Sequence, residues 1–130
     1  MSPELEAAAR SGDVSAVSAL LRSGGNVDAR DRHGQTALML AAHRGHLGLV
    51  ELLIDLGADL DVTAKYGLSA LMLAVVAGHE KVAEKLIAAG ADRSIRGTGA
   101  PGFTGKTAGE LAMARGMIAL AAKLVPSDPR

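Results

Sequence analysis

The sequence Gly34-Gln-Thr-Ala-Leu-Met-Leu-Ala-Ala-His-Arg-Gly-His46 returns further along the chain as Gly67-Leu-Ser-Ala-Leu-Met-Leu-Ala-Val-Val-Ala-Gly-His79. Self-similarity at a fixed period of this size is typical of repeat proteins, in which each copy buries its apolar face only against its neighbours. The chain is therefore predicted to form a solenoid. Its function is expected on a surface rather than in an enclosed pocket.

The same frame extends toward both ends of the chain. Gly12 precedes Gly45 by the same interval that separates Gly34 from Gly67, whereas the interval from Gly67 to Gly105 is longer by five residues. Five residues are therefore inserted within 97–104. We predict a single domain that is divided into an N-terminal cap at 1–30, repeats at 31–63 and 64–96, a C-terminal cap with the insertion at 97–125, and a tail at 126–130.

One copy of the repeat carries the fullest pattern: Gly34, Thr36, Leu38, Ala41, Ala42, Gly45, His46, Val50, Leu53, Ile54, Gly57, Ala58 and Asp59. This pattern resembles the ankyrin repeat, and the resemblance covers nearly the whole chain. It implies a mainly α fold, an ankyrin-repeat solenoid of stacked helix-turn-helix pairs with β-hairpin or turn fingers. It also implies a non-catalytic protein–protein interaction module.

Each unit is expected to contain one helix pair. The first pair is predicted over 3–11 and 14–23, where Asp13 is placed to cap the second helix. The first helices of the later units are expected to be capped by Thr36, Ser69 and Thr107. The small residues Ala41, Ala74 and Ala112 are expected to let neighbouring helices approach closely.

The composition excludes several classes of function. The 130 residues include no cysteine, which excludes disulfides, thiol nucleophiles and cysteine-ligated metals. Fourteen basic residues balance fourteen acidic ones, which argues against a bulk attraction to nucleic acid or membrane. The first residues do not read as a secretory signal, and no apolar run approaches the ~18 residues of a membrane span. We expect a cytoplasmic protein.

The segment Ala100-Pro-Gly-Phe-Thr-Gly-Lys-Thr107 satisfies a permissive form of the phosphate-binding loop. A working loop needs a strand before it and a helix after it, so that backbone amides converge on phosphate. Residues 91–96 make a poor strand, and the Gly-Lys-Thr falls on the frame of the repeat. We therefore expect a structural role for this segment and no cofactor.

His46 and His79 occupy equivalent positions and could be considered as metal ligands. Equivalent residues of stacked helices lie about 10 Å apart, which is too far for one ion with bonds of ~2 Å. We predict instead that these side chains bond to the backbone between repeats. Met39 and Met72 are interpreted as core residues. No catalytic constellation can be assembled from adjacent repeat positions, so we expect no enzyme.

In the fold that the chain resembles, partners bind to the finger tips and to the exposed side of each first helix, which line a concave groove. Carried over position by position, this implies twelve partner-binding residues: Arg32, His33, Gln35, His43, Arg44, Lys65, Tyr66, Leu68, Val76, Phe103, Lys106 and Arg115. Asp31 is the only acid near this set. We predict a monomer whose basic groove binds another protein with an acidic or mixed acidic and apolar surface.

Other interpretations remain open at this point. The basic residues can be ordinary solvated side chains, with Tyr66 packed on neighbouring fingers. The chain can also be a structural subunit that stabilises a complex, or a nucleic-acid binder that uses the same groove. The last helix carries Met117 and Ile118 on its outer face, so either its buried stripe is narrow or this end docks onto a partner.

Overall fold

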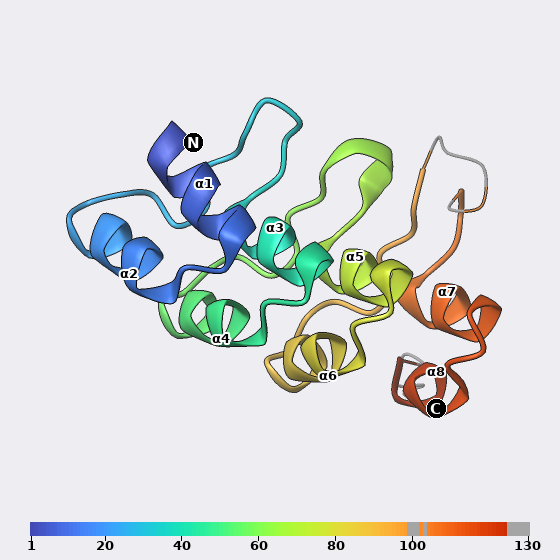
Figure 1. The fold of residues 1–130 in the computed structure, drawn as a ribbon. Helices are drawn as coiled ribbons and strands as arrows, with labels where there is room; N and C mark the ends of the chain where they lie inside the picture. The colour runs from blue at the N-terminus through green and yellow to red at the C-terminus, as the bar shows by residue number, and fades with distance from the viewer. Residues whose placement is uncertain (99–101, 103, 125–130) are drawn as a thin grey trace.

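The computed structural model describes residues 1–98, 102 and 104–124. Over this part of the chain it contains eight α-helices and one short 3-10 helix, η1 (Figure 1). The elements are α1 (Pro3–Ser11), α2 (Val14–Arg22), α3 (Ala37–Arg44), α4 (Leu47–Asp55), η1 (Lys65–Gly67), α5 (Ala70–Ala77), α6 (Glu80–Ala88), α7 (Ala108–Ala114) and α8 (Ile118–Leu124). None of these helices is long and apolar enough to cross a membrane.

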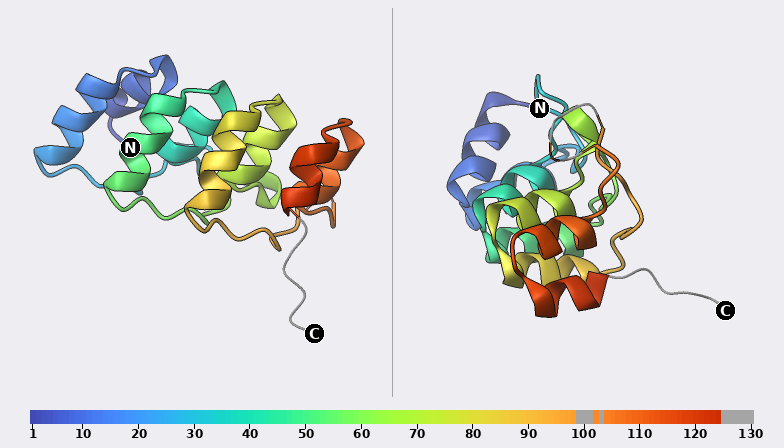
Figure 2. Two further views of the ribbon diagram at one scale, coloured as in Figure 1. Left: turned by 90° about the horizontal axis from the view of Figure 1, so that it is seen from below. Right: turned by 90° about the vertical axis from the view of Figure 1, so that its right-hand side faces the viewer.

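The helices form two layers. The first helices of the pairs contact one another in the order α1, α3, α5 and α7, and the second helices do so in the order α2, α4, α6 and α8. Figures 1 and 2 show the resulting stack of helix pairs, from which the loops before α3 and α5 project on one side. The predicted mainly α solenoid of stacked helix pairs is confirmed.

The predicted caps are present at the helix starts. Thr36 Oγ1 accepts a hydrogen bond from the amide of Met39 at 3.3 Å. The other predicted caps, Asp13, Ser69 and Thr107, each accept from an amide in the first turn of their helix in the same way. These bonds satisfy amides that a helix start leaves without an intrahelical partner.

Small and flexible side chains fill the space between neighbouring helices. Ala41, Ala74 and Ala112 are completely buried, and Met39 and Met72 are 1% exposed. The predicted close approach of the first helices therefore rests on alanine at the contact. The two methionines belong to the core, as predicted.

The two turn histidines connect neighbouring units. His46 Nε2 lies 3.0 Å from the carbonyl oxygen of Arg10, and His79 Nε2 lies 3.1 Å from that of His43. A carbonyl only accepts, so Nε2 carries the proton in both rings. Each ring bonds to the backbone of the preceding unit, which confirms the structural role predicted for these histidines.

We use the name finger for each loop that precedes a first helix: finger 2 (31–35), finger 3 (64–68) and finger 4 (97–106). One backbone hydrogen bond of 2.8–3.0 Å closes the base of each finger, from the amide of Asp31 to Gln35, of Ala64 to Leu68, and of Gly97 to Lys106. The first two bonds span four residues and the third spans nine. Finger 4 is therefore five residues longer between the same two points.

The β-hairpin form of the fingers is not confirmed. Within the described ranges the β pairing consists of isolated bridges, which join Arg30 to Thr36 and Gly97 to Thr104. In finger 2 only three residues separate the two closing residues, and the side chain of Asp31 takes up two of the backbone amides. The described fingers are therefore built from turns, not from paired strands.

Candidate functional site

The predicted binding residues fall into two groups at opposite ends of the first helices. The finger group contains Arg32, His33, Gln35, Lys65, Tyr66, Leu68 and Lys106. The helix-end group contains His43, Arg44, Val76 and Arg115. A helix of eight residues such as α3 is about 12 Å long, which sets the scale of their separation. Phe103 lies outside the described residues.

Most of the finger group surrounds one hollow of about 300 Å³ between fingers 2 and 3. We call this hollow the finger pocket, and its lining residues are His33, Gln35, Ala64, Lys65, Tyr66, Leu68 and Leu73. Five of the twelve predicted residues are thus brought together. Arg32 adjoins the pocket, because its Nε lies 3.4 Å from His33 Nε2.

The finger pocket has a buried apolar floor and an exposed polar rim. Leu68 and Leu73 are 8% and 6% exposed, whereas Tyr66 is 40% exposed and His33 and Lys65 are also exposed. Leu68, predicted as a groove residue, therefore lies in the floor. Sequence reasoning missed Leu73, because it belongs to the repeated Leu-Met-Leu run that indicates core.

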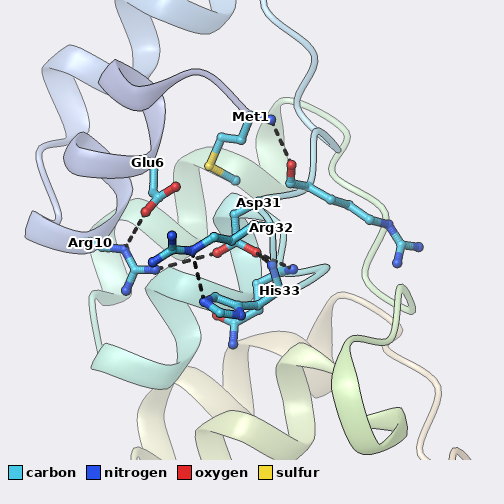
Figure 3. A network of polar contacts seen from close by, with 8 residues as sticks. Met1, Glu6, Arg10, Asp31, Arg32 and His33 are labelled. Atoms are coloured by element: carbon cyan, nitrogen blue, oxygen red, sulfur yellow. Dashed lines mark hydrogen bonds and ion pairs between the residues drawn. The ribbon is translucent and has the colours of Figure 1, made fainter.

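The side chain of Asp31 organises finger 2. Its Oδ1 accepts from the amides of His33 at 2.8 Å and Gln35 at 2.9 Å. The side chain is fully buried, and its Oδ2 lies 3.6 Å from Arg10 Nη2, which reaches across from α1 (Figure 3). A buried carboxylate needs such a positive neighbour. The carboxylate of Asp31 is therefore unavailable to a partner.

Finger 3 is organised differently, because Ala64 stands at the position equivalent to Asp31. Its tip is the single 3-10 turn η1, in which Tyr66 has φ 65° and ψ 17°. Tyr66 is the only non-glycine residue with positive φ in the part of the chain that the structure describes. This left-handed conformation costs a non-glycine residue about 1–2 kcal/mol. The carbonyl of Tyr66 accepts from the amide of Thr98 at 2.6 Å, which ties finger 3 to finger 4.

The rim of the finger pocket carries positive charge without nearby compensation. Arg32 and Lys65 are exposed, and neither forms an ion pair with any described residue. Lys65 Nζ lies 5.0 Å from the centroid of the Tyr66 ring, within the range of a cation–π contact. The pocket thus combines an apolar floor, an aromatic ring and two available cations.

The residues of the helix-end group do not line the finger pocket, and some of them also contribute to the structure of the helix ends. His43 and Arg44 lie in the last turn of α3, where positive charge is favourable next to the carbonyl end of the helix. Burial and the neighbouring Arg44 lower the pKa of His43, so its ring is neutral at pH 7. Val76 is half-buried in α5, and the guanidinium of the exposed Arg115 lies beside Gly78.

Lys106 and Thr107 are the last two residues of the segment that resembles a phosphate-binding loop. In the structure both residues help to position the start of α7. The carbonyl of Lys106 closes finger 4, and Thr107 forms a reciprocal cap with Glu110. The backbone N–H of Thr107 donates to Glu110 Oε1 at 3.0 Å and lowers the pKa of that carboxyl. Residues 100, 101 and 103 of the motif lie outside the described residues.

A second hollow, of about 360 Å³, lies at the C-terminal end of the stack, and Met113, Ala121 and Leu124 are among its lining residues. Met113 is 55% exposed, whereas its equivalents Ala42 and Val75 are completely buried. The next unit covers those two residues, so this hollow is the stacking surface that the last unit leaves uncovered.

The comparisons with known proteins agree with this architecture. The sequence profile of a family described as ankyrin repeats (3 copies) matches residues 5–96, which is more than half of the chain. The matched range ends before finger 4 and the fourth helix pair, where the five inserted residues break the regular spacing of the repeat. No curated protein matches the sequence at a significant level.

Proposed function

The chain belongs to the ankyrin repeat family, whose members generally bind other proteins and are typically not catalysts, and on that premise we propose that it is a protein-binding module. It holds its partner on the fingers and on the exposed ends of the first helices. The partner presents an acidic or mixed acidic and apolar surface, and the chain acts as a monomer in the cytoplasm.

The finger pocket is the observation that carries this proposal. It gathers five of the twelve candidate residues around one hollow, with a buried apolar floor and an exposed aromatic rim. Tyrosine and arginine are enriched among the residues that dominate binding energies at protein interfaces. Both residue types stand at this pocket, as Tyr66 and Arg32.

The charges around the pocket support an acidic partner. Arg32 and Lys65 form no ion pair with any described residue, and Asp31 is held inside finger 2. A surface of one sign speeds encounter with a partner of the opposite sign and disfavours like-charged competitors. A formally neutral protein thus presents a locally positive binding surface.

Affinity capture from the native lysate tests the proposal. The wild type is compared with the triple variant Arg32→Glu/Tyr66→Ala/Lys106→Glu, after circular dichroism has shown that the variant is folded. We expect the wild type to retain a protein that the variant loses.

The matched control variant is Arg22→Glu/Ile118→Ala/Lys81→Glu. It also reverses two cations and truncates one exposed large side chain, but it does so on the second-helix layer. This control should capture the same protein as the wild type. Equal capture by the groove variant, or equal loss in the control, would show that the groove is not the binding site.

A further inference from the structure

The finger pocket has the features of a receptor for one particular kind of segment. Building on the proposed function, we propose that the pocket holds one apolar side chain of an extended acidic segment of the partner, whose flanking carboxylates pair with Arg32 and Lys65. The exposed ring of Tyr66 covers the inserted side chain. The apolar site, the charges and the ring each have a separate structural basis.

The size and lining of the pocket suit a single apolar side chain. Its volume of about 300 Å³ lies at the lower limit of the ~300–1,000 Å³ typical of pockets that enclose a whole small molecule. Leu68 and Leu73 form the floor, and both are almost completely buried. The residues that line the hollow come from fingers 2 and 3, and both fingers project from the helix stack (Figure 1). This placement favours a narrow chain that crosses the fingers over a broad flat surface.

The charges around the pocket select carboxylates. Lys65 lines the pocket from finger 3, and Arg32 stands on finger 2 beside the lining residue His33. The two cations therefore come from the two different fingers. The only acid in the sequence of these two fingers, Asp31, is buried against Arg10. Arg32 uses its Nε on His33, which leaves its other N–H groups for an acid. A carboxylate bound there forms the charge-assisted hydrogen bonds that are stronger than neutral ones.

The backbone of Tyr66 adopts a strained conformation in the turn that carries the ring. A glycine would adopt φ 65° without cost, so the tyrosine occupies this position against a local conformational preference. The bond from Thr98 to the Tyr66 carbonyl holds the turn from the neighbouring finger. Strained residues of this kind concentrate at ligand-binding positions. The backbone turn that carries the ring is thereby held at the rim of the pocket.

Three fluorescein-labelled peptides test the proposal. The first has a central leucine with two glutamates on each side, the second replaces the glutamates by lysines, and the third replaces the leucine by glycine. We expect the first to bind in fluorescence anisotropy and the other two to bind at least about tenfold more weakly, because each lacks one required contact. Amide chemical shifts should change at 33–35 and 65–68.

Variants of Tyr66 separate the role of the ring from the stability of the fold. Tyr66→Ala and Tyr66→Gly should both weaken binding of the first peptide about tenfold or more. Tyr66→Gly should at the same time resist urea better than Tyr66→Ala, because glycine removes the strain. Arg32→Glu should also weaken binding, whereas Lys81→Glu, a charge reversal on α6, should not.

Each contrary result overturns the proposal and leaves the proposed function separately testable. If the lysine peptide binds as tightly, or if amide shifts cluster at His43 and Arg44, the pocket does not select an acidic segment, although the groove can still bind a protein. If no peptide binds, the pocket proposal is wrong, and lysate capture decides the proposed function. Wild-type affinity in Tyr66→Gly would exclude a role for the ring.

Discussion

Replacing Gly45 with alanine tests how the histidine turns join one unit to the next. Gly45 ends α3 with φ 75°, a conformation that glycine adopts freely. A Cβ at this position would lie 2.7 Å from His79 Nδ1. The ring cannot withdraw without breaking its hydrogen bond to the carbonyl of His43. The substitution therefore displaces a contact between two units as well as straining the backbone.

The expected loss has two parts. The left-handed backbone costs alanine about 1–2 kcal/mol, and the smaller entropy of the unfolded alanine chain offsets roughly 0.4–1 kcal/mol of this cost. Displacing the His79 ring removes a hydrogen bond worth about 1 kcal/mol, together with its packing on the turn. We expect Gly45→Ala to lower the free energy of unfolding by about 2 kcal/mol.

Gly57 provides the matched control for this substitution. Its φ is 84°, but no atom lies within 4 Å of a Cβ built there. Gly57→Ala therefore carries the backbone strain without the clash and should cost about 1 kcal/mol. Urea unfolding followed by far-ultraviolet circular dichroism measures both variants. In a His79→Ala background the two glycine substitutions should cost the same. Equal costs in the wild-type background would refute the proposed contact.

Three further predictions concern packing and ionisation. Ala74→Leu should overpack the first-helix layer and lower the free energy of unfolding by about 1–3 kcal/mol, seen in the same urea assay. Burial and Arg44 hold the pKa of His43 below its ordinary 6.5, so the stability present above pH 6.5 should decrease as pH falls through the lowered pKa. In an NMR titration Arg44→Ala should raise that pKa. The Lys123 ammonium, 2.6 Å from Glu84, holds the pKa of Glu84 below 4.5. The stability that the ionised Glu84 carboxylate contributes should be lost as pH falls through that lowered pKa. Lys123→Met should raise the pKa of Glu84, which an NMR titration of the carboxyl group measures.

The sequence predicts the frame of this fold well because the frame repeats. Thr36 and Ser69 occupy equivalent positions in successive copies, and both cap a first helix. The same holds for His46 and His79, which make the same bond to the preceding unit. A residue that serves backbone geometry or close helix contact is required in every copy, so comparing copies reveals it without knowledge of the surroundings.

Features that occur in one unit only could not be predicted in this way. Asp31 was expected as an acid near the groove, yet its burial depends on Arg10 in the preceding unit, and the equivalent Ala64 gives no hint of this. The left-handed conformation of Tyr66 could not be predicted from the sequence either. The next residue, Gly67, also has a positive φ, of 70°. The glycine of the repeat pattern therefore predicts a left-handed residue at 67 but not at 66. The repeat pattern indicated candidate binding residues, but not which of them line one pocket.

The two walls of the finger pocket show how a repeated backbone gives an unsymmetrical site. Fingers 2 and 3 close with the same four-residue hydrogen bond, so the two walls have a common base. The side chains between the closing residues nevertheless differ, with His33 on one wall where Tyr66 stands on the other. In the binding mode that we propose, an extended segment across the fingers would meet an imidazole ring on one wall and a phenol ring on the other. Its two directions would therefore differ in energy, so the proposed site would select the orientation of the segment as well as its acidic charge.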